Sequence, residues 1–161
     1  MPTTPAGSAN IGVVAPETLK SRSGLDFLKE IVAGTLPQPP MTATLGYRLV
    51  AGAPGFAVFE GEPEGLHYNP LGTVHAGFAA TLLDSCMACA VHTTVEKGSG
   101  YTTLELKVNL VRAITATTGR VRAEGRVLHA GRRTATAEGR LFDAGGTLLA
   151  HGTTTCLIFP L

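Results

Sequence analysis

The residues with the clearest capacity for chemistry lie in one stretch, 69–84. Its second part opens a run from Phe78 to Val91 that is apolar on nearly all sides, and a helix without a polar face belongs in a protein core. Asp84 is the one ionisable residue of this run. A carboxylate that loses its hydration is rare unless it is paired or does chemistry. The pattern therefore predicts a functional carboxylate, with a structural hydrogen bond to the backbone, Thr81 or Ser85 as the alternative.

The residues just before the apolar run suit a site for developing negative charge. Turn formers at Asn69–Gly72 are followed by His75 and by the small residues Ala76 and Gly77. The first N–H groups of a helix and its dipole favour negative charge, and small side chains let a ligand approach closely. His75 can either fix the helix entry or transfer a proton, and Asn69 is first of all a turn former.

Composition excludes several classes of function. The chain has 161 residues, a net charge of +1 and no basic stripe interleaved with aromatic residues, which argues against a nucleic-acid partner. Residues 1–14 lack the pattern of a signal peptide, and the 16 residues 76–91, interrupted by Asp84, are too short and too charged to span a bilayer. We therefore expect no membrane association and a cytoplasmic location.

The cysteine content also favours a cytoplasmic location. There are three, Cys86, Cys89 and Cys156, so a disulfide framework is not expected and a reducing compartment fits better. The Cys86-x-x-Cys89 spacing with His92 suggests a metal or redox site, but no second ligand pair accompanies it and both thiols fall in mid-helix. We expect neither a metal nor another cofactor.

Periodicity divides the chain into a flexible N-terminal arm, residues 1–23, and a single domain, residues 24–161. A short helix is expected over 24–34, and the long apolar helix is expected to end near Lys97-Gly98. Several segments read as strands, the last four of them alternating with period two: 42–51, 55–62, 104–110, 121–127, 134–142 and 147–159. Short connections between the later strands favour antiparallel hairpins. The order predicts an α+β protein in which one antiparallel sheet wraps around one long buried helix.

This order of elements, with its motifs, resembles the hotdog-fold acyl-CoA thioesterases of the phenylacetate-degradation (PaaI) type over roughly residues 40–159. Three motifs carry the resemblance: Asn69-x-x-Gly72-x-x-His75-x-Gly77 followed by Leu83-Asp84, then Thr103-x-Glu105-Leu106-x-Val108-Asn109-Leu110-Val111-Arg112, then His129-Ala130-Gly131-Arg132. Their order along the chain makes the resemblance more specific than any one motif.

The resemblance implies a role for each matched residue. Asp84 corresponds to the acidic general base or nucleophile that acts on the thioester. The backbone N–H of Ala76 corresponds to the donor that polarises the thioester carbonyl, and His75 is the neighbour that fixes this turn. Asn69 corresponds to the residue that orients the substrate or the attacking water, and Thr103 to a hydroxyl near the carboxylate in some members.

Two details of the motifs leave open points. The family commonly has two glycines after the histidine, where this chain has Ala76 and Gly77; alanine still offers a backbone N–H, although the space for a thioester is slightly reduced. Thr103 shares its strand parity with Glu105 and Lys107 and lies opposite the leucine face, so the pattern alone does not bring it to Asp84.

The spacing of the two main groups has a consequence for assembly. Asp84 follows Ala76 by eight residues, which is about 12 Å along a helix at about 1.5 Å per residue. One helix cannot bring both groups to the same carbonyl, whereas two antiparallel copies can. We therefore expect an obligate homodimer with shared sites, and the resemblance adds a tetramer of two such dimers.

The expected function is hydrolysis of an aromatic or medium-chain acyl-CoA to the free acid and CoA. Arg112, Arg132 and Arg133 lie at strand ends, where they can bind the CoA phosphates or remain solvated. The alternatives are a hotdog enoyl-CoA hydratase or dehydratase and a non-catalytic acyl-CoA-binding protein. The hydratase signature has Asp and His where this chain has His67 and Gly72, which counts against it.

Overall fold

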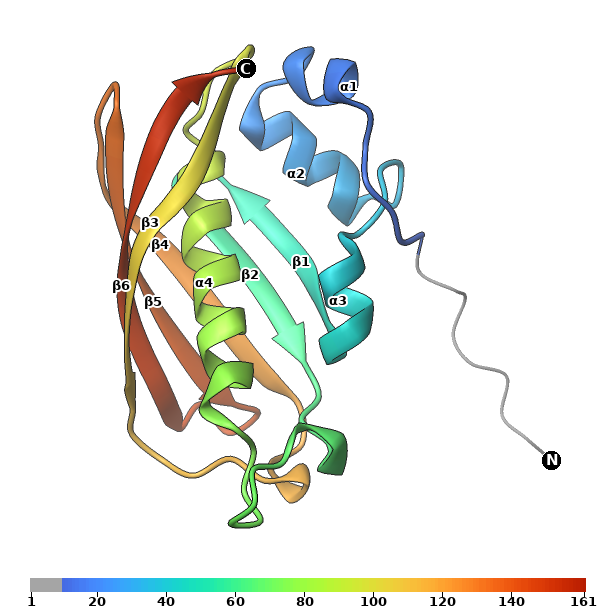
Figure 1. Ribbon diagram of the computed structural model, residues 1–161, viewed down its shortest axis with the longest axis vertical. Helices are drawn as coiled ribbons and strands as arrows, with labels where there is room; N and C mark the ends of the chain where they lie inside the picture. Colours follow the sequence, from blue (N-terminus) through green and yellow to red (C-terminus); the bar gives the residue numbers. More distant parts are fainter. Residues whose placement is uncertain (1–9) are drawn as a thin grey trace, which may run out of the picture.

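The computed structural model describes residues 10–161 (Figure 1). Its helices, with two short 3-10 helices η1 and η2, and its strands are, in chain order, α1 Pro16–Lys20, α2 Gly24–Val32, α3 Pro40–Leu45, β1 Tyr47–Ala53, β2 Phe56–Gly61, η1 Gly65–His67, α4 Ala76–His92, β3 Ser99–Leu110, η2 Ala116–Thr118, β4 Val121–Ala130, β5 Thr134–Asp143 and β6 Leu148–Pro160. The predicted helix over 24–34 and the four predicted later strands are confirmed as α2 and β3 to β6.

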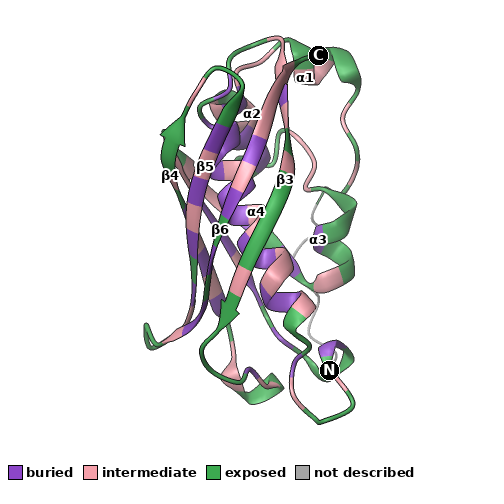
Figure 2. Ribbon diagram, turned by 60° about the vertical axis from the view of Figure 1, so that its left-hand side comes forward, coloured by how far each residue is buried: buried purple, intermediate pink, exposed green. Residues whose placement is uncertain are grey.

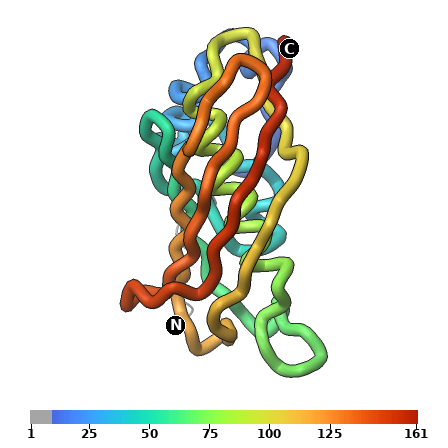
Figure 3. The backbone as a smooth tube through the Cα atoms, turned by 90° about the vertical axis from the view of Figure 1, so that its left-hand side faces the viewer, coloured from blue at the N-terminus to red at the C-terminus, as the bar shows by residue number. Residues whose placement is uncertain are grey.

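All six strands form one antiparallel sheet in the order β1-β2-β4-β5-β6-β3. The sheet curls around α4, and β1 and β3 are its two edges (Figures 1 and 3). The predicted α+β architecture, an antiparallel sheet wrapped around one long helix, is confirmed. One hydrophobic cluster joins the inner face of the sheet to α4 and α2.

A row of glycines lets α4 lie directly on the sheet. Gly125, Gly139 and Gly152 are register partners on β4, β5 and β6. A Cβ at Gly125 would overlap the carbonyl oxygen of Cys86, and one at Gly139 would lie 2.7 Å from Cγ of Met87. Because Gly125 has no side chain, the helix backbone lies directly against β4, and the absence of a side chain at Gly139 leaves room for the Met87 side chain over β5.

Helix α4 is apolar as predicted, but one stripe of it is not covered by the sheet. Thr81, Asp84, Ser85 and Cys89 are only half-buried, whereas the faces that carry Leu82 and Met87 are fully buried. The uncovered stripe lies between the two sheet edges. The Tyr47 hydroxyl of β1 contacts Ser85 at 3.2 Å, and β3 contacts Asp84 from the other side.

The edge at β1 is occupied by a side chain. Nε2 of Gln38 donates to the carbonyl oxygen of Leu49 at 3.0 Å, and the Leu49 N–H donates to Oε1 of Gln38 at 3.0 Å. The backbone of Gln38 is in turn paired with residues 10–12, through its N–H to Asn10 at 2.7 Å and its carbonyl to Gly12 at 3.0 Å. The amide therefore takes the place of a neighbouring strand in the middle of β1.

Three expectations from the sequence need correction. The flexible arm predicted over 1–23 is wrong for Pro16–Lys20, which form α1, while residues 1–9 lie outside the described residues. The strand predicted over 42–51 is wrong in its first part, because Pro40–Leu45 form α3. Pro40 opens that helix and Gly46, with φ of +63°, ends it. The division into an arm and a domain over 24–161 stays a prediction.

The third correction concerns the end of α4. The helix ends at His92 and not near Lys97-Gly98. Thr93 and Thr94 follow at once, and their hydroxyls donate to the carbonyl oxygens of Ala90 at 2.6 Å and Val91 at 2.7 Å. Side chains that satisfy the last carbonyls end the helix one turn before the glycine is reached.

Candidate active site

The turn before α4 is held by Asn69. Oδ1 of Asn69 accepts from the N–H groups of Leu71 at 2.9 Å and Thr73 at 3.3 Å, and Nδ2 donates to Oγ1 of Thr73 at 2.8 Å. Gly72 within this turn has a φ of +81°, which glycine adopts without strain. Asn69 is therefore a turn former in this structure, and its role toward a substrate or water stays a prediction.

His75 caps α4 and binds one of the two backbone N–H groups, those of Ala76 and Gly77, that could bind a carbonyl oxygen. The Gly77 N–H donates to Nδ1 of His75 at 2.9 Å, and His75 is the N-cap residue. The Ala76 N–H has no hydrogen-bond partner among the described residues. The unpaired donor at the helix start is thus Ala76, while Gly77 is engaged in the cap; the role of the Ala76 N–H toward a thioester carbonyl stays a prediction.

A small cavity of about 250 Å³ lies at this helix start, and Asn69, His75, Ala76 and Arg112 are among its lining residues. Arg112 follows the end of β3 directly, so the fold brings this predicted CoA-binding residue to the unpaired N–H. Arg132 and Arg133 lie in the β4–β5 hairpin, at the opposite end of the molecule (Figure 1). Of these three arginines, Arg112 is the one that lies near the helix start of its own chain.

Asp84 forms a second group with Thr103. Oγ1 of Thr103 donates to Oδ1 of Asp84 at 3.0 Å. In the single chain the loss of hydration expected for this carboxylate is only partial, because Asp84 lies on the half-buried stripe between the sheet edges. None of the residues that line the cavity at the helix start is Asp84 or Thr103.

A β-bulge explains how Thr103 reaches Asp84. The register of β3 against β6 pairs Thr103 with Cys156 and Glu105 with Thr155, so Leu104 is an extra residue. The bulge reverses the parity of the strand. Thr103 therefore faces the helix together with Leu106 beyond the bulge, which strict alternation had placed on the opposite face.

The cysteines beside Asp84 are not nucleophiles at neutral pH. Burial raises the pKa of the Cys89 thiol to about 12, and burial also raises the pKa of Cys86 and of Cys156 above the ordinary value. All three are free thiols. Since a thiolate is the reactive form, none of these thiols is expected to react at neutral pH, and the catalytic role of Asp84 stays a prediction. Among residues 10–161 no group of three or more His, Cys, Asp or Glu side chains is arranged to hold a metal ion.

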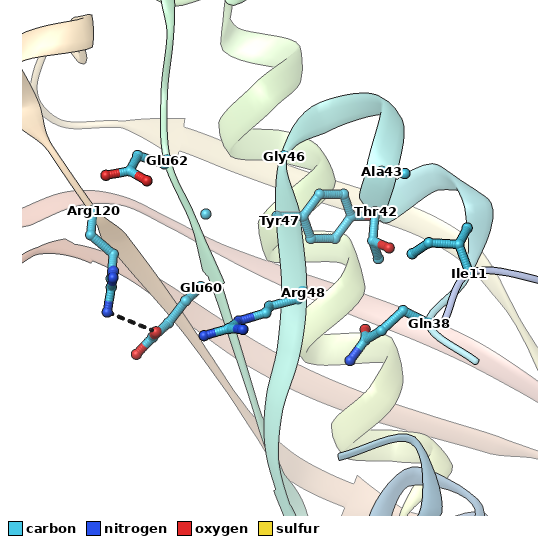
Figure 4. Close-up of a pocket in the computed structure, with 11 residues that line it drawn as sticks. Ile11, Gln38, Thr42, Ala43, Gly46, Tyr47, Arg48, Glu60, Glu62 and Arg120 are labelled. Atoms are coloured by element: carbon cyan, nitrogen blue, oxygen red, sulfur yellow. Dashed lines mark ion pairs between the residues drawn. The ribbon is translucent and has the colours of Figure 1, made fainter. Parts of the chain in front are cut away.

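A larger cavity, of about 490 Å³, is elsewhere (Figure 4). It lies between α3 and strands β1 and β2, and none of the predicted site residues lines it. Its charged residues include Arg120, which pairs with Glu60 at 3.7 Å, and the exposed Arg48. The chemistry predicted from the sequence is therefore at the smaller cavity and the stripe.

Comparison with known proteins agrees with this geometry. A family model described as the thioesterase superfamily matches residues 71–150, which include Ala76, Asp84 and Thr103. A single-residue mutant of the phenylacetic acid degradation protein PaaI from Thermus thermophilus is 33% identical, over 73% of this chain and 97% of that chain, with a TM-score of 0.66. The chain belongs to the thioesterase superfamily.

Two further solved structures support the assignment of the fold. A phenylacetic acid degradation-related protein from Ralstonia eutropha JMP134 is 28% identical over 81% of this chain and 98% of that chain, with a TM-score of 0.73. A thioesterase from Haemophilus influenzae, at 18% identity, covers 75% of this chain and 83% of its own, with a TM-score of 0.69, and shows the shared fold alone. No protein of curated function gives a significant match.

These findings confirm the resemblance, the hotdog fold and the activity class. The protein is a thioester hydrolase, and neither the hydratase nor the non-catalytic alternative is supported. Within this thioesterase the described helices include none with the length and apolar character that crossing a bilayer requires. One residue that the sequence analysis did not select, His67, packs behind the helix start; its only sequence signal was its place two residues before Asn69.

Proposed function

We propose that this thioesterase hydrolyses acyl-CoA thioesters, aromatic or medium-chain, in sites shared by two copies of the chain. The observation that carries the proposal is the unpaired N–H of Ala76 beside Arg112, separated on the same helix from the Asp84–Thr103 pair. An unpaired N–H at a helix start stabilises the negative charge that develops on an attacked carbonyl oxygen. Arg112 at the same cavity supplies a cation for a CoA phosphate.

Asp84 is the proposed reactive carboxylate. With Oδ1 held by the Thr103 hydroxyl, Oδ2 is available to take a proton from water or to attack the carbonyl carbon. If Asp84 acts as a base, it takes a proton from the attacking water, the C–S bond breaks, and that proton passes to the CoA thiolate. If Asp84 attacks, an anhydride between the acyl group and Asp84 forms as the CoA thiolate leaves; water then hydrolyses the anhydride, which restores the carboxylate and supplies the proton taken up by the thiolate. The family's remaining assignments, His75 as the cap of the turn and Asn69 as the residue that orients substrate or water, accompany this proposal.

A homodimer is proposed from the open edge of the sheet. Strand β3 is a 12-residue edge strand, and a long edge strand is a template for pairing. Leu106, Leu110 and Val111 are 36%, 53% and 49% exposed, and Figure 2 shows the exposed length of β3 along this edge. Pairing of two β3 edges about a two-fold axis normal to the sheet makes the two α4 helices antiparallel.

That arrangement accounts for the spacing of the two groups. With the axis beside residue 80, midway between Ala76 and Asp84, the start of each helix lies level with the Asp84 of the other. Arg132 and Arg133, at the far end of each chain, are then turned toward the helix start of the other copy. A tetramer of two such dimers and a cytoplasmic location stay predictions.

Release of free thiol from a panel of aromatic and medium-chain acyl-CoAs tests the reaction. We expect thiol release without addition of a metal or other cofactor. Conversion of an enoyl-CoA without thiol release would support the hydratase instead, and tight binding without turnover would support a non-catalytic protein.

Complementation between variants tests the shared site. Ala76→Pro and Asp84→Asn chains are each expected to be almost inactive as purified. Equal amounts, unfolded together and refolded, form heterodimers in half of the dimers, each with one intact site. We therefore expect about a quarter of the wild-type activity. A mixture that stays as inactive as its components would place the whole site in one chain.

A further inference from the structure

His67 is a buried histidine that the reaction described above does not use. It is the last residue of η1, it is 7% exposed, and its ring packs on Phe78 in the first turn of α4 with centroids 4.6 Å apart. A buried histidine so close to the helix start needs a physical account.

The backbone and side chain of His67 connect η1 to the cap of α4. Nδ1 of His67 accepts from the Glu64 N–H at 2.9 Å, and the His67 N–H donates to the Glu64 carbonyl at 3.0 Å. The carbonyl oxygen of His67 accepts from the His75 N–H at 2.8 Å. His75 is the residue whose ring holds Gly77 and precedes Ala76. His67 thus fixes the residue from which the unpaired Ala76 N–H projects.

The neutral imidazole of His67 is held in one tautomer. Because Nδ1 accepts a hydrogen bond, the neutral ring carries its proton on Nε2. Nε2 is buried and finds no acceptor among residues 10–161. An unpaired buried donor destabilises a fold, because it has lost its water without gaining an acceptor. A phenylalanine of similar shape would pack on Phe78 without this cost but would lose the acceptor for the Glu64 N–H, so what the histidine contributes here beyond packing is its Nδ1.

We propose that His67 is a positioning residue of the thioesterase site: through Nδ1 and its backbone carbonyl it sets the direction of the Ala76 N–H. The inference rests on the proposed function, in which that N–H polarises the thioester carbonyl. A displacement of about 1 Å at such a group can lower a rate by up to about 10²-fold. The role places His67 behind the site, in contact with η1 and α4 and not with the substrate.

Three substitutions separate positioning from packing. In His67→Asn the amide oxygen stands near the place of Nδ1, so the bond from Glu64 is kept while the ring contact with Phe78 is lost. In His67→Phe the ring contact is kept while the acceptor is lost. His67→Gln places a polar atom near Nε2 and leaves Nδ1 unreplaced. The Asn variant therefore keeps the acceptor and loses the ring contact, and the Phe variant keeps the ring contact and loses the acceptor.

We expect the variants to rank in one order by kcat and in the opposite order by unfolding temperature. For His67→Phe we expect kcat to fall at least about 10-fold, with KM within about 3-fold of wild type and with unfolding at an unchanged or higher temperature. His67→Gln should lose kcat similarly. For His67→Asn we expect a lower unfolding temperature and a kcat within about 3-fold of wild type. Retention of kcat by His67→Phe, or activity that follows stability through the series, would overturn the proposal.

A second measurement does not depend on turnover. Backbone amide chemical shifts of Ala76 and Gly77 should change in His67→Phe and His67→Gln and return close to wild-type values in His67→Asn. Unchanged shifts in His67→Phe would refute the positioning role, whether or not the enzyme is active. Absence of thiol release by the wild-type protein would refute the proposed function, and the shifts would still decide the role of His67.

His92 provides the matched control. It is also a buried histidine on an aromatic ring, at the other end of α4, with Tyr101 4.8 Å away between centroids. His92→Phe should change the unfolding temperature and leave both kcat and the two amide shifts at their wild-type values.

Discussion

Helix α4 begins in an open turn and ends beneath other elements, and its two termini differ in whether the backbone groups left free by the helix are hydrogen-bonded. At the end, the carbonyl oxygens of Cys89, Ala90, Val91 and His92 each accept from a following threonine or from Val95. At the start, the Ala76 N–H has no partner among the described residues. The satisfied carbonyl groups at the C-terminal end of α4 fit a role in stability, and the unpaired N–H at its N-terminal end fits the proposed role in binding.

Packing around the two ends differs in the same way. The ring of His92 lies between Phe27 and Tyr101, with centroid distances of 5.4 and 4.8 Å, and α2 covers this end. The start of the helix lies beside a cavity and is held mainly by hydrogen bonds of the preceding turn. Changes at the start should therefore alter turnover, and changes at the end should alter stability.

The largest effect is expected at Asp84, the proposed reactive group. Asp84→Asn should lower kcat by at least about 10²-fold, because an amide neither takes a proton nor attacks a carbonyl. Stability should change little, since the Thr103 hydroxyl can still donate to the amide oxygen. Steady-state thiol release and thermal unfolding measure the two quantities. Asp26→Asn, at an exposed position of α2, is the control, and normal turnover by Asp84→Asn would make this carboxylate structural.

At the start of the helix, Ala76→Pro should lower kcat by about 10²- to 10³-fold, the usual loss for one oxyanion donor. Proline is tolerated in a first helical turn, and His75, with φ of −59° and ψ of 139°, already has the extended conformation that precedes a proline. Circular dichroism should show a folded protein. Ala76→Gly keeps the N–H and should keep its activity. An active proline variant would move the oxyanion donor away from residue 76.

At the end of the helix, the pH dependence of stability should reveal His92. Burial lowers the pKa of His92 from 6.5 to about 4. Below about pH 6.5 the unfolded chain binds a proton at this residue that the folded chain does not bind until about pH 4. Stability is thus lost as the pH falls through this range, by roughly 3 kcal/mol, at about 1.4 kcal/mol per pH unit.

Urea denaturation of wild type and His92→Phe from pH 7 to pH 4 isolates this contribution as the difference between the two curves. Activity at neutral pH should be the same for both proteins. Parallel curves would mean that His92 takes up its proton equally in the folded and unfolded states.

The smallest effect is expected at Gly24, where α2 contacts the end of α4. Its N–H donates to the Val95 carbonyl at 2.9 Å, and a Cβ would overlap the His92 carbonyl oxygen. Gly24→Ala should lower the free energy of unfolding by about 1–3 kcal/mol, as overpacking does, with kcat unchanged. Gly65→Ala adds a methyl group in open space and should cost less. A loss of kcat in Gly24→Ala would show that the two ends of the helix are coupled.

Much of the fold could be predicted because its elements differ in period. The apolar run of α4 and the alternation in β3 to β6 each specify one structure. The predicted strand 42–51 includes residues 42–45, which are helical, and Pro40 and Gly46 mark the ends of that helix. Thr103 could not be placed from alternation, because one extra residue, Leu104, reverses the parity of its strand. The site could be predicted less completely from the sequence, since the role of His67 depends on which elements pack behind the helix start.

The carboxamide of Gln38 has a consequence for how copies of this chain can grow into larger structures. A curled sheet with two free edges can add β3 of one chain to β1 of the next without end, which produces an open filament. Gln38 occupies the hydrogen-bonding groups of Leu49 in the middle of β1, so this head-to-tail addition is blocked there. In the proposed dimer β3 pairs with its own copy, and that pairing uses the free β3 edge of both chains. A single glutamine side chain thus favours a closed pair over polymerisation.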